Sequence, residues 1–360
     1  MISASGHTEA ESLVIILRAS VDGRVVVLPD DQFHLLTDAD ADADAMQASI
    51  RKMATQLINL PDVERLSPSV IRILGGNPGK VSNPLHPARG QALTSAVQFT
   101  LQGTNTYVLG TGPRRILIDT GEGKPAWIKA LINTLASEKA EVETAVITHW
   151  HHDHTGGIQD LVAFSPKTKI YKHQPNQGLL DIQDGQHFQV QGAKIRSLFS
   201  PGHTNDHMAF VLQEEDAMFT GDNVLGHGTA VFENLALYLS SLDNMKDHFK
   251  GRAYPGHGAI IEDGPSKIME YIRHRQQRED QVLQVLKSST SSPGIEISEG
   301  EPEAWASMDI VKVIYKDVPE SLHLPAHGGV MQTLWKLQAE DKVSEIPETS
   351  RWLIRNRAVL

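Results

Sequence analysis

The chain has 360 residues, of which 40% are hydrophobic, enough for one large domain with an appendage and a sizeable core. Its 33 basic and 44 acidic residues give a formal charge of −11, which argues against a broad phosphate-binding surface, and the absence of cysteine excludes disulfides and thiolate ligands. No apolar stretch is long enough for a membrane span, and the polar N-terminus lacks the pattern of a secretory signal, so we expect a cytoplasmic protein.

Residues 1–55 form the first predicted unit, an N-terminal extension in which we find no chemistry. Within it, residues 11–31 predict a β-hairpin, because two apolar runs flank Asp22-Gly23, a pair that favours tight turns. The repeat DADADADA at 38–45 is acidic and of low complexity, which predicts a flexible connector.

Residues 56–264 form the second predicted unit, in which strands and helices alternate. Helices are expected at 125–137, where a proline precedes apolar residues at helical spacing, and at 231–245. Apolar runs that end in glycine turns predict strands at 70–76, 104–112, 114–121, 142–149, 195–203, 207–212, 217–222 and 252–258. This alternation predicts an α/β fold whose functional residues gather where the strands stop.

Residues 265–360 form the third predicted unit, a C-terminal helical module. A long amphipathic helix is expected at 265–287, and SSTSSPG ends it. Helical patterns return at 302–317 and 327–340, and a short strand is expected at 351–355. Helices followed by a small wing predict a winged-helix-like arrangement.

A dense group of potential metal ligands follows the strand at 142–149, in the stretch THWHHDHTGG. It contains His149, His151, Asp153 and His154, whose side chains can converge in a turn at the end of a strand. Nitrogen and carboxylate ligands without sulfur suit Zn²⁺, Fe or Mn²⁺, and imidazole-rich sites favour Zn²⁺.

Three further fragments carry the same chemistry at the ends of other predicted strands. His203, Asp222 and His257 each lie beside a glycine, which lets the backbone approach a site closely. Together with the first group they make seven ligand-type residues, enough for two metal ions with an open position for water or substrate.

The motif H-x-H-x-D-H at 149–154, with the three downstream residues, resembles the metallo-β-lactamase superfamily. The resemblance implies an αββα sandwich, with two β-sheets packed together and helices outside. It also implies two divalent metal ions, Zn²⁺ in the first place and Mn²⁺ as the alternative. The first ion would take His149, His151 and His203, the second would take Asp153, His154 and His257, and Asp222 would bridge them.

The same resemblance implies the reaction and the substrate class. Asp153 would orient the nucleophilic water and shuttle a proton to the leaving group. The blocks LQGTNTYVLGTG and AYPGHGAIIEDG resemble a branch that contains animal endoribonucleases and fungal lactamase-like thioesterases. The block VERLSPSVIRILGGNPGK is more similar to the fungal thioesterases, those of the atrochrysone carboxyl type. Those proteins hydrolyse the thioester between an aromatic polyketide and the acyl carrier protein of a non-reducing polyketide synthase. The related animal endoribonucleases, which cut single-stranded RNA, and glyoxalase-II-like hydrolases of small thioesters are the alternatives.

Residues 81–98 interrupt the resemblance. In the proteins that the chain resembles, GGNPGK runs directly into FTLQGTNTY, whereas here 18 residues intervene. A structureless loop of this length is uncommon inside a compact domain. The segment is either a genuine insertion or a retained intron in the coding sequence.

Two further sets of residues are candidates for substrate or partner contacts. His227 follows the bridging Asp222 closely and could line the substrate pocket. The segment RHRQQR places Arg273, Arg275 and Arg278 on one predicted helix, where they could dock an acidic carrier protein. The same strip would be needed to bind RNA, which the acidic charge makes a poorer partner without excluding it.

Overall fold

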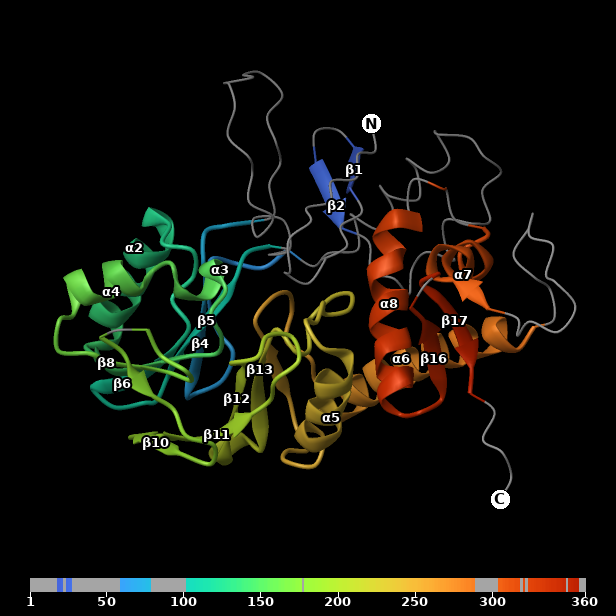
Figure 1. The fold of residues 1–360 in the computed structure, drawn as a ribbon. Helices are drawn as coiled ribbons and strands as arrows, with labels where there is room; N and C mark the ends of the chain where they lie inside the picture. The colour runs from blue at the N-terminus through green and yellow to red at the C-terminus, as the bar shows by residue number, and fades with distance from the viewer. Residues whose placement is uncertain are drawn as a thin grey trace, which may run out of the picture.

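Two β-sheets packed against each other form the centre of the protein (Figure 1). The computed structural model describes residues 18–21, 24–27, 59–78, 102–176, 178–288, 304–317, 320, 323–347 and 349–355. The first sheet has seven strands that follow one another in chain order: β3 (Val63–Arg65), β4 (Val70–Leu74), β5 (Asn105–Leu109), β6 (Arg114–Ile118), β7 (Glu141–Ile147), β8 (Lys169–Lys172) and β9 (Leu180–Asp181). The second sheet has five: β10 (His187–Val190), β11 (Ala193–Phe199), β12 (Met208–Leu212), β13 (Ala217–Gly221) and β14 (Ala253–Pro255).

The central strands are buried on both faces because helices cover the outer side of each sheet. In β12, Met208 and Phe210 face the other sheet, whereas Ala209 and Val211 face helices. This alternation is the two-residue period of a strand. It explains why the sequence shows these strands as continuous apolar runs.

Among the residues that the structure describes, five helices make the outer layers of the sandwich. Against the first sheet lies α2 (Pro125–Glu138), whose Trp127, Leu131 and Leu135 are buried, followed by the short α3 (His152–Thr155) and α4 (Ile158–Phe164). Against the second sheet lie α5 (Leu235–Met245) and α6 (Gly264–Lys287). The order helix, sheet, sheet, helix is visible across Figure 1 and confirms the predicted αββα architecture. A 3₁₀ turn, η3 (Gln213–Glu215), connects β12 to β13.

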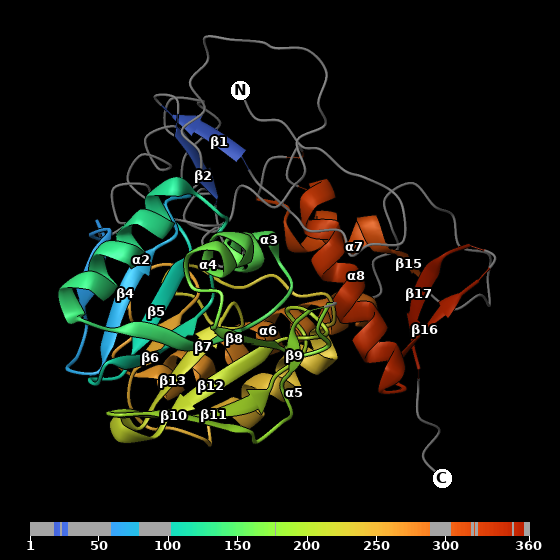
Figure 2. The ribbon, with the colours of Figure 1, turned by 90° about the vertical axis from the view of Figure 1, so that its left-hand side faces the viewer.

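A C-terminal module with its own core follows α6 (Figure 2). It contains β15 (Trp305–Ala306), α7 (Ser307–Ile314), α8 (His323–Ala339), β16 (Val343–Ile346) and β17 (Arg351–Ile354). The three strands form one sheet in the order β15-β17-β16. The purely helical pattern expected at 302–317 is therefore wrong at 305–306, which pair with β17. Buried Trp305 and Trp352 lie opposite each other in this pairing and join the module core.

Helix α6 belongs to both cores. Ile268 and Tyr271 pack in the core beneath the second sheet, whereas Val282 and Val285 pack in the core of the C-terminal module. The buried Glu279 accepts ion pairs from two lysines of the module, at 2.6 and 3.1 Å. The helix thus fixes the module to the sandwich.

The predicted three-arginine dock on α6 is wrong. Arg275 is only 6% exposed, and its guanidinium lies 4.8 Å from the centre of the Phe232 ring. Arg278 covers the ring of Tyr315 at the same distance, which leaves Arg273 as the exposed member. Residues 268, 271, 275, 279 and 282 repeat at intervals of three or four, so Arg275 lies on the buried stripe of the helix.

Three expectations concern the N-terminal region and the interruption of the domain. Strands β1 (Arg18–Val21) and β2 (Arg24–Val27) pair antiparallel, as the predicted hairpin requires. The acidic repeat at 38–45 and the insertion at 81–98 lie outside the described residues. None of the described helices is both long enough and apolar enough to cross a membrane.

Candidate metal centre

The seven candidate ligands all follow the ends of strands at one edge of the sandwich. His149 comes two residues after β7, and His203, Asp222 and His257 follow β11, β13 and β14. Strands β11, β13 and β14 run in the same direction, so their carboxyl ends meet at this edge. The backbone N–H of Met208 donates to the Thr148 carbonyl at 2.8 Å and joins the end of β7 to the second sheet here. The topology therefore brings both halves of the sandwich to one site.

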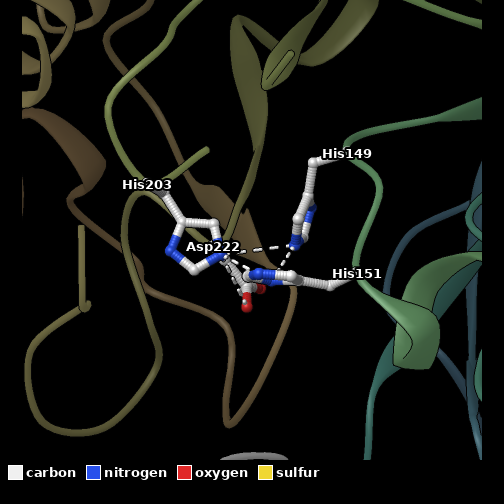
Figure 3. A group of neighbouring side chains, drawn as sticks. All are labelled: His149, His151, His203 and Asp222. Atoms are coloured by element: carbon white, nitrogen blue, oxygen red, sulfur yellow. Dashed lines mark hydrogen bonds and ion pairs between the residues drawn. The ribbon is translucent and has the colours of Figure 1, made fainter. Parts of the chain in front are cut away.

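Three imidazoles and one carboxylate form the first group (Figure 3). His149 Nε2 lies 2.9 Å from His151 Nδ1 and 3.3 Å from His203 Nε2. His151 Nδ1 and His203 Nε2 are 3.0 Å apart. Asp222 Oδ2 lies 3.7 Å from His203 Nε2. Four ligand atoms thus converge on one point.

Hydrogen bonds on the far side of two rings fix which nitrogen faces the centre. His203 Nδ1 donates to the Val231 carbonyl at 2.8 Å, so its Nε2 carries a lone pair. His149 Nδ1 lies 2.9 Å from Thr148 Oγ1, whose own hydrogen goes to Asp119, so His149 Nε2 also faces inward as a lone pair. Lone pairs that face one another cannot form hydrogen bonds, whereas a cation between them satisfies all of them.

The three imidazoles of the first group are uncharged at neutral pH, so the Asp222 carboxylate is its only charged member. Burial and the neighbouring histidines lower the pKa of His149 well below its usual range, and they lower that of His151 to about 3. Burial also lowers the pKa of His203. These rings are consequently deprotonated, the state in which histidine binds metal.

Asp153, His154 and His257 form the second group. Asp153 Oδ2 lies 3.4 Å from His154 Nε2 and 3.2 Å from His257 Nε2. Asp222 contacts this group as well, since its Oδ1 lies 3.4 Å from His154 Nε2 and its Oδ2 lies 3.2 Å from His257 Nε2. One carboxylate therefore lies between the two groups.

The second group has the charge balance of a cation site. His154 Nε2 and Asp222 Oδ1 are buried and have no hydrogen-bond partner among the described residues. Although burial opposes it, the two carboxylates raise the pKa of His154 well above its ordinary value and that of His257 to about 9. Protons on these two histidines then supply the positive charge that a bound metal ion would provide. Both groups fit divalent ions of the Zn²⁺ or Mn²⁺ type.

Asp119 contacts a candidate ligand and is not singled out by the sequence analysis. Its Oδ2 lies 2.8 Å from His154 Nδ1, and its Oδ1 accepts from the backbone N–H of Thr148 at 2.8 Å. It follows β6 with a left-handed backbone, φ 59°. The sequence does carry a signal, since Asp119-Thr-Gly ends a predicted strand, but the glycine by itself indicates only a turn.

We expect Asp119→Asn to weaken the centre without unfolding the protein. The amide cannot hold His154 in the tautomer that points its Nε2 inward as well as a carboxylate does. Loss of such outer partners typically costs roughly 10- to 100-fold in metal affinity or activity. Competition with a chromogenic chelator measures the affinity, and the exposed Asp243→Asn is the matched control. Equal metal affinity in both variants would contradict this role.

Thr104 and Asn105 support the second group. Thr104 Oγ1 donates to Asp153 Oδ2 at 3.1 Å. The Asn105 side chain donates to the carbonyls of Pro255 and Gly258, both at 2.9 Å, on either side of His257. The two residues therefore position ligands from outside the groups.

Gly256 shows why glycine is needed beside a ligand. A Cβ at this position would lie 2.1 Å from Asp222 Oδ1, closer than any real contact. We expect Gly256→Ala to displace the Asp222 carboxylate and to reduce the number of metal ions bound per chain, as measured by elemental analysis. Gly329→Ala is the matched control, because a Cβ there meets nothing within 4 Å. A full metal complement in Gly256→Ala would refute the argument.

The segment after Asp222 closes around the site and joins it to the helices behind. Val231 supplies the carbonyl that orients His203, and the neighbouring Ala230 carbonyl accepts from Arg275 at 3.0 Å. Gln332 of α8 donates to the Glu233 carbonyl at 3.0 Å, so the C-terminal module also contacts this segment. His227 is half-buried here and belongs to neither ligand group.

Comparisons with known proteins agree with this geometry. The model of the metallo-beta-lactamase superfamily matches residues 99–257, and that of the beta-lactamase associated winged helix domain matches residues 306–352. The lactamase-like protein adaB of Aspergillus niger is 42% identical over 82% of this chain and 89% of its own length. The atrochrysone carboxyl ACP thioesterase of Aspergillus chevalieri is 43% identical over 84% of this chain and 92% of its own length. A beta-lactamase domain protein from Burkholderia ambifaria shares the fold, with a TM-score of 0.63 at 15% identity, over 84% of this chain and 98% of its own.

Proposed function

Because the chain belongs to the metallo-β-lactamase superfamily, and within it is similar to fungal lactamase-like proteins, we propose that it is a metal-dependent thioesterase. Its substrate would be a polyketide acyl group bound through a thioester to an acyl carrier protein. The product would be the free polyketide acid, released in secondary metabolism.

One observation carries the proposal. All seven ligand-type residues converge in two groups, in a chain that is 43% identical over nearly the whole length of a protein named as an acyl carrier protein thioesterase. Fold similarity alone would not identify a substrate, since this fold hosts several kinds of hydrolysis. Identity at this level, over both the sandwich and the C-terminal module, favours a shared reaction class.

Each of the two groups would hold one divalent ion. His149, His151 and His203 would hold the first and Asp153, His154 and His257 the second, with Asp222 between them. When bound, such ions supply an acidified water as nucleophile and a Lewis acid for the carbonyl oxygen. The imidazole-rich first group favours Zn²⁺, and Mn²⁺ is the alternative.

Asp153 is the residue that we assign to proton handling. Burial alone would raise the pKa of its carboxyl, but His154 and His257 hold it well below its usual range. The group stays ionised, so it can accept a hydrogen bond from water and orient it without retaining the proton. Thr104 fixes one of its oxygens by donating from Oγ1.

Hydrolysis then needs no nucleophile from the protein. The oxygen of water forms a bond with the acyl carbon, and the carbon–sulfur bond breaks. The carrier-protein thiol leaves with one proton of the water, and the acyl group leaves as a carboxylic acid. Asp153 is placed to pass that proton toward the sulfur. His227 we retain as a candidate substrate contact, since its segment lies beside the His257 turn.

The burial of Arg275 bears on both the thioesterase proposal and the ribonuclease alternative. A basic strip on α6 would suit RNA phosphates as well as an acidic carrier protein, but only Arg273 of its three arginines is exposed. Helix α6 therefore gives no support to RNA binding. A carrier protein would have to dock through other surfaces.

The test is a parallel assay of the purified protein. Metal ions are counted by elemental analysis, and hydrolysis is measured on an acyl-carrier-protein thioester and on single-stranded RNA, with Asp153→Ala as the control. We expect two ions per chain and thioester cleavage that disappears in the variant, with intact RNA. RNA cleavage that depends on Asp153, with the thioester untouched, would replace this proposal by the endoribonuclease.

A further inference from the structure

Trp150 is an exposed aromatic residue between two candidate metal ligands. Its side chain is 53% exposed, the highest value among the large apolar residues described in the two-sheet domain. It lies between His149 and His151 in the chain, so it cannot be far from the centre. Large apolar side chains at a functional site commonly serve binding.

Trp150 is held in place although it is exposed. Its ring centre lies 4.4 Å from that of His151, with the planes at 70°, an edge-to-face contact. The Glu233 carboxylate lies close enough to interact with the indole, and it accepts from the backbone N–H of Asn205 at 3.2 Å. One side of the indole is therefore fixed by the protein, and more than half of the side chain remains open to solvent.

We propose that Trp150 is the platform on which the aromatic acyl group of the thioester packs. The inference rests on the proposed function and names a residue that selects its substrate. The carbonyl to be attacked must lie at the two ligand groups, and His151 belongs to the first of them. The rest of the acyl group is bonded directly to that carbonyl carbon, and the indole of Trp150 is in ring contact with His151.

The substrate has two parts, the acyl group and the carrier arm, and their chemistry decides which part contacts the indole. A fused aromatic acyl group can stack on a two-ring indole over a large flat area, and a preoriented ring loses little entropy on binding. The carrier arm is a flexible chain with polar amides and gains little from such a surface. We therefore assign the platform to the acyl side.

Glu233 connects the surroundings of the indole to the metal centre. It belongs to the segment that also supplies the Val231 carbonyl to His203. The backbone of Glu233 is itself fixed, because its N–H donates to the Gly202 carbonyl at 2.7 Å and its carbonyl accepts from Gln332. The platform is thus anchored to the same frame as the first ligand group.

The experiment compares two thioesters of N-acetylcysteamine, one with a 2-naphthoyl and one with an octanoyl group, on the metal-loaded full chain. We expect Trp150→Ala to lower the ratio of kcat/KM for naphthoyl over octanoyl by about 10-fold, which corresponds to about 1.4 kcal/mol. Trp150→Phe should recover most of the ratio. Calorimetric binding of 2-naphthoate and octanoate should show the same change in selectivity.

Trp335→Ala is the matched control, because Trp335 is a second exposed tryptophan, 49% exposed, on α8 of the C-terminal module. Its selectivity ratio should equal that of the unmodified chain. An unchanged ratio in Trp150→Ala, or an equal loss on both thioesters with a full metal complement, would overturn the platform and leave the thioesterase standing. Hydrolysis of neither thioester nor of an acyl carrier protein thioester by the unmodified chain would overturn both.

Discussion

Asp222→Asn is expected to lower kcat/KM by about 1,000-fold or more, well beyond the roughly 10- to 100-fold typical of outer partners of a metal site. The Asp222 carboxylate contacts His203 from one group and His154 and His257 from the other, at 3.2–3.7 Å. The amide keeps the volume of the side chain but replaces one anionic oxygen by an N–H₂ that repels a cation. The substitution therefore removes the element shared by both groups.

Elemental analysis and kinetics together check this expectation. Elemental analysis should show fewer than two ions per chain for Asp222→Asn, and added metal should restore little activity. Asp243→Asn, an exposed surface change on α5, should keep both the metal and the rate. Wild-type kinetics in Asp222→Asn would show that Asp222 does not bridge the groups.

Metal removal is expected to abolish hydrolysis and to leave a protein that takes up metal with a measurable release of protons. In the metal-free protein at pH 7, the three histidines of the first group are neutral because burial lowers their pKa values. His154 and His257 are protonated because the carboxylates raise theirs. Filling both groups with Zn²⁺ at pH 7 should therefore release about two protons per chain from the second group, in addition to any proton that metal-bound water loses.

The pH dependence of this release has a definite sign. The pKa of His257 is raised to about 9, so this ring loses its proton as the pH rises through that value, and its share of the release then disappears. A weakly buffered titration with a pH indicator, repeated between about pH 7 and pH 10, measures it. Release that is unchanged across this window, or that is absent at pH 7, would contradict the charge assignment.

The same shifts affect the stability of the metal-free protein in opposite directions. For His149, whose folded pKa is lowered, the stabilisation is present above the unfolded pKa of about 6.5 and is lost as the pH falls below it. For His257, whose folded pKa is raised, the stabilisation is present below about 6.5 and is lost as the pH rises through about 9. Metal binding replaces the proton at His257, so the loaded protein should not lose stability in that alkaline window.

Local sequence determined the central architecture and the candidate ligands. Apolar runs that end in glycine turns marked most strands of the two sheets, and the helical spacing at 125–137 gave α2 to within one residue. The dense group His149 to His154 can be recognised as a candidate metal site from the sequence, because so many imidazoles and a carboxylate in six residues need a shared partner. Residues that act together within one turn can be recognised from their spacing alone.

The short strands and the exact ends of some elements could not be predicted from the sequence. No pattern in the sequence indicated β8, β9 and β10. The pattern at 231–245 predicted that helix α5 begins at 231, whereas the chain is irregular until Asn234 caps the helix. Short strands gain their stability from pairing with neighbours that lie far away in the chain, so their own residues carry little information.

Only the tertiary structure decided which residues far apart in the sequence contact one another. Asp119 reaches His154 across 35 positions, and the Val231 carbonyl reaches His203 across 28. Both contacts depend on where loops of the two sheets meet, and a backbone carbonyl leaves no mark on the sequence at all. Composition and spacing thus determined which atoms can bind metal. The packing of the sheets decided which tautomers face the centre and which charges surround it, because those depend on contacts that only the folded chain makes.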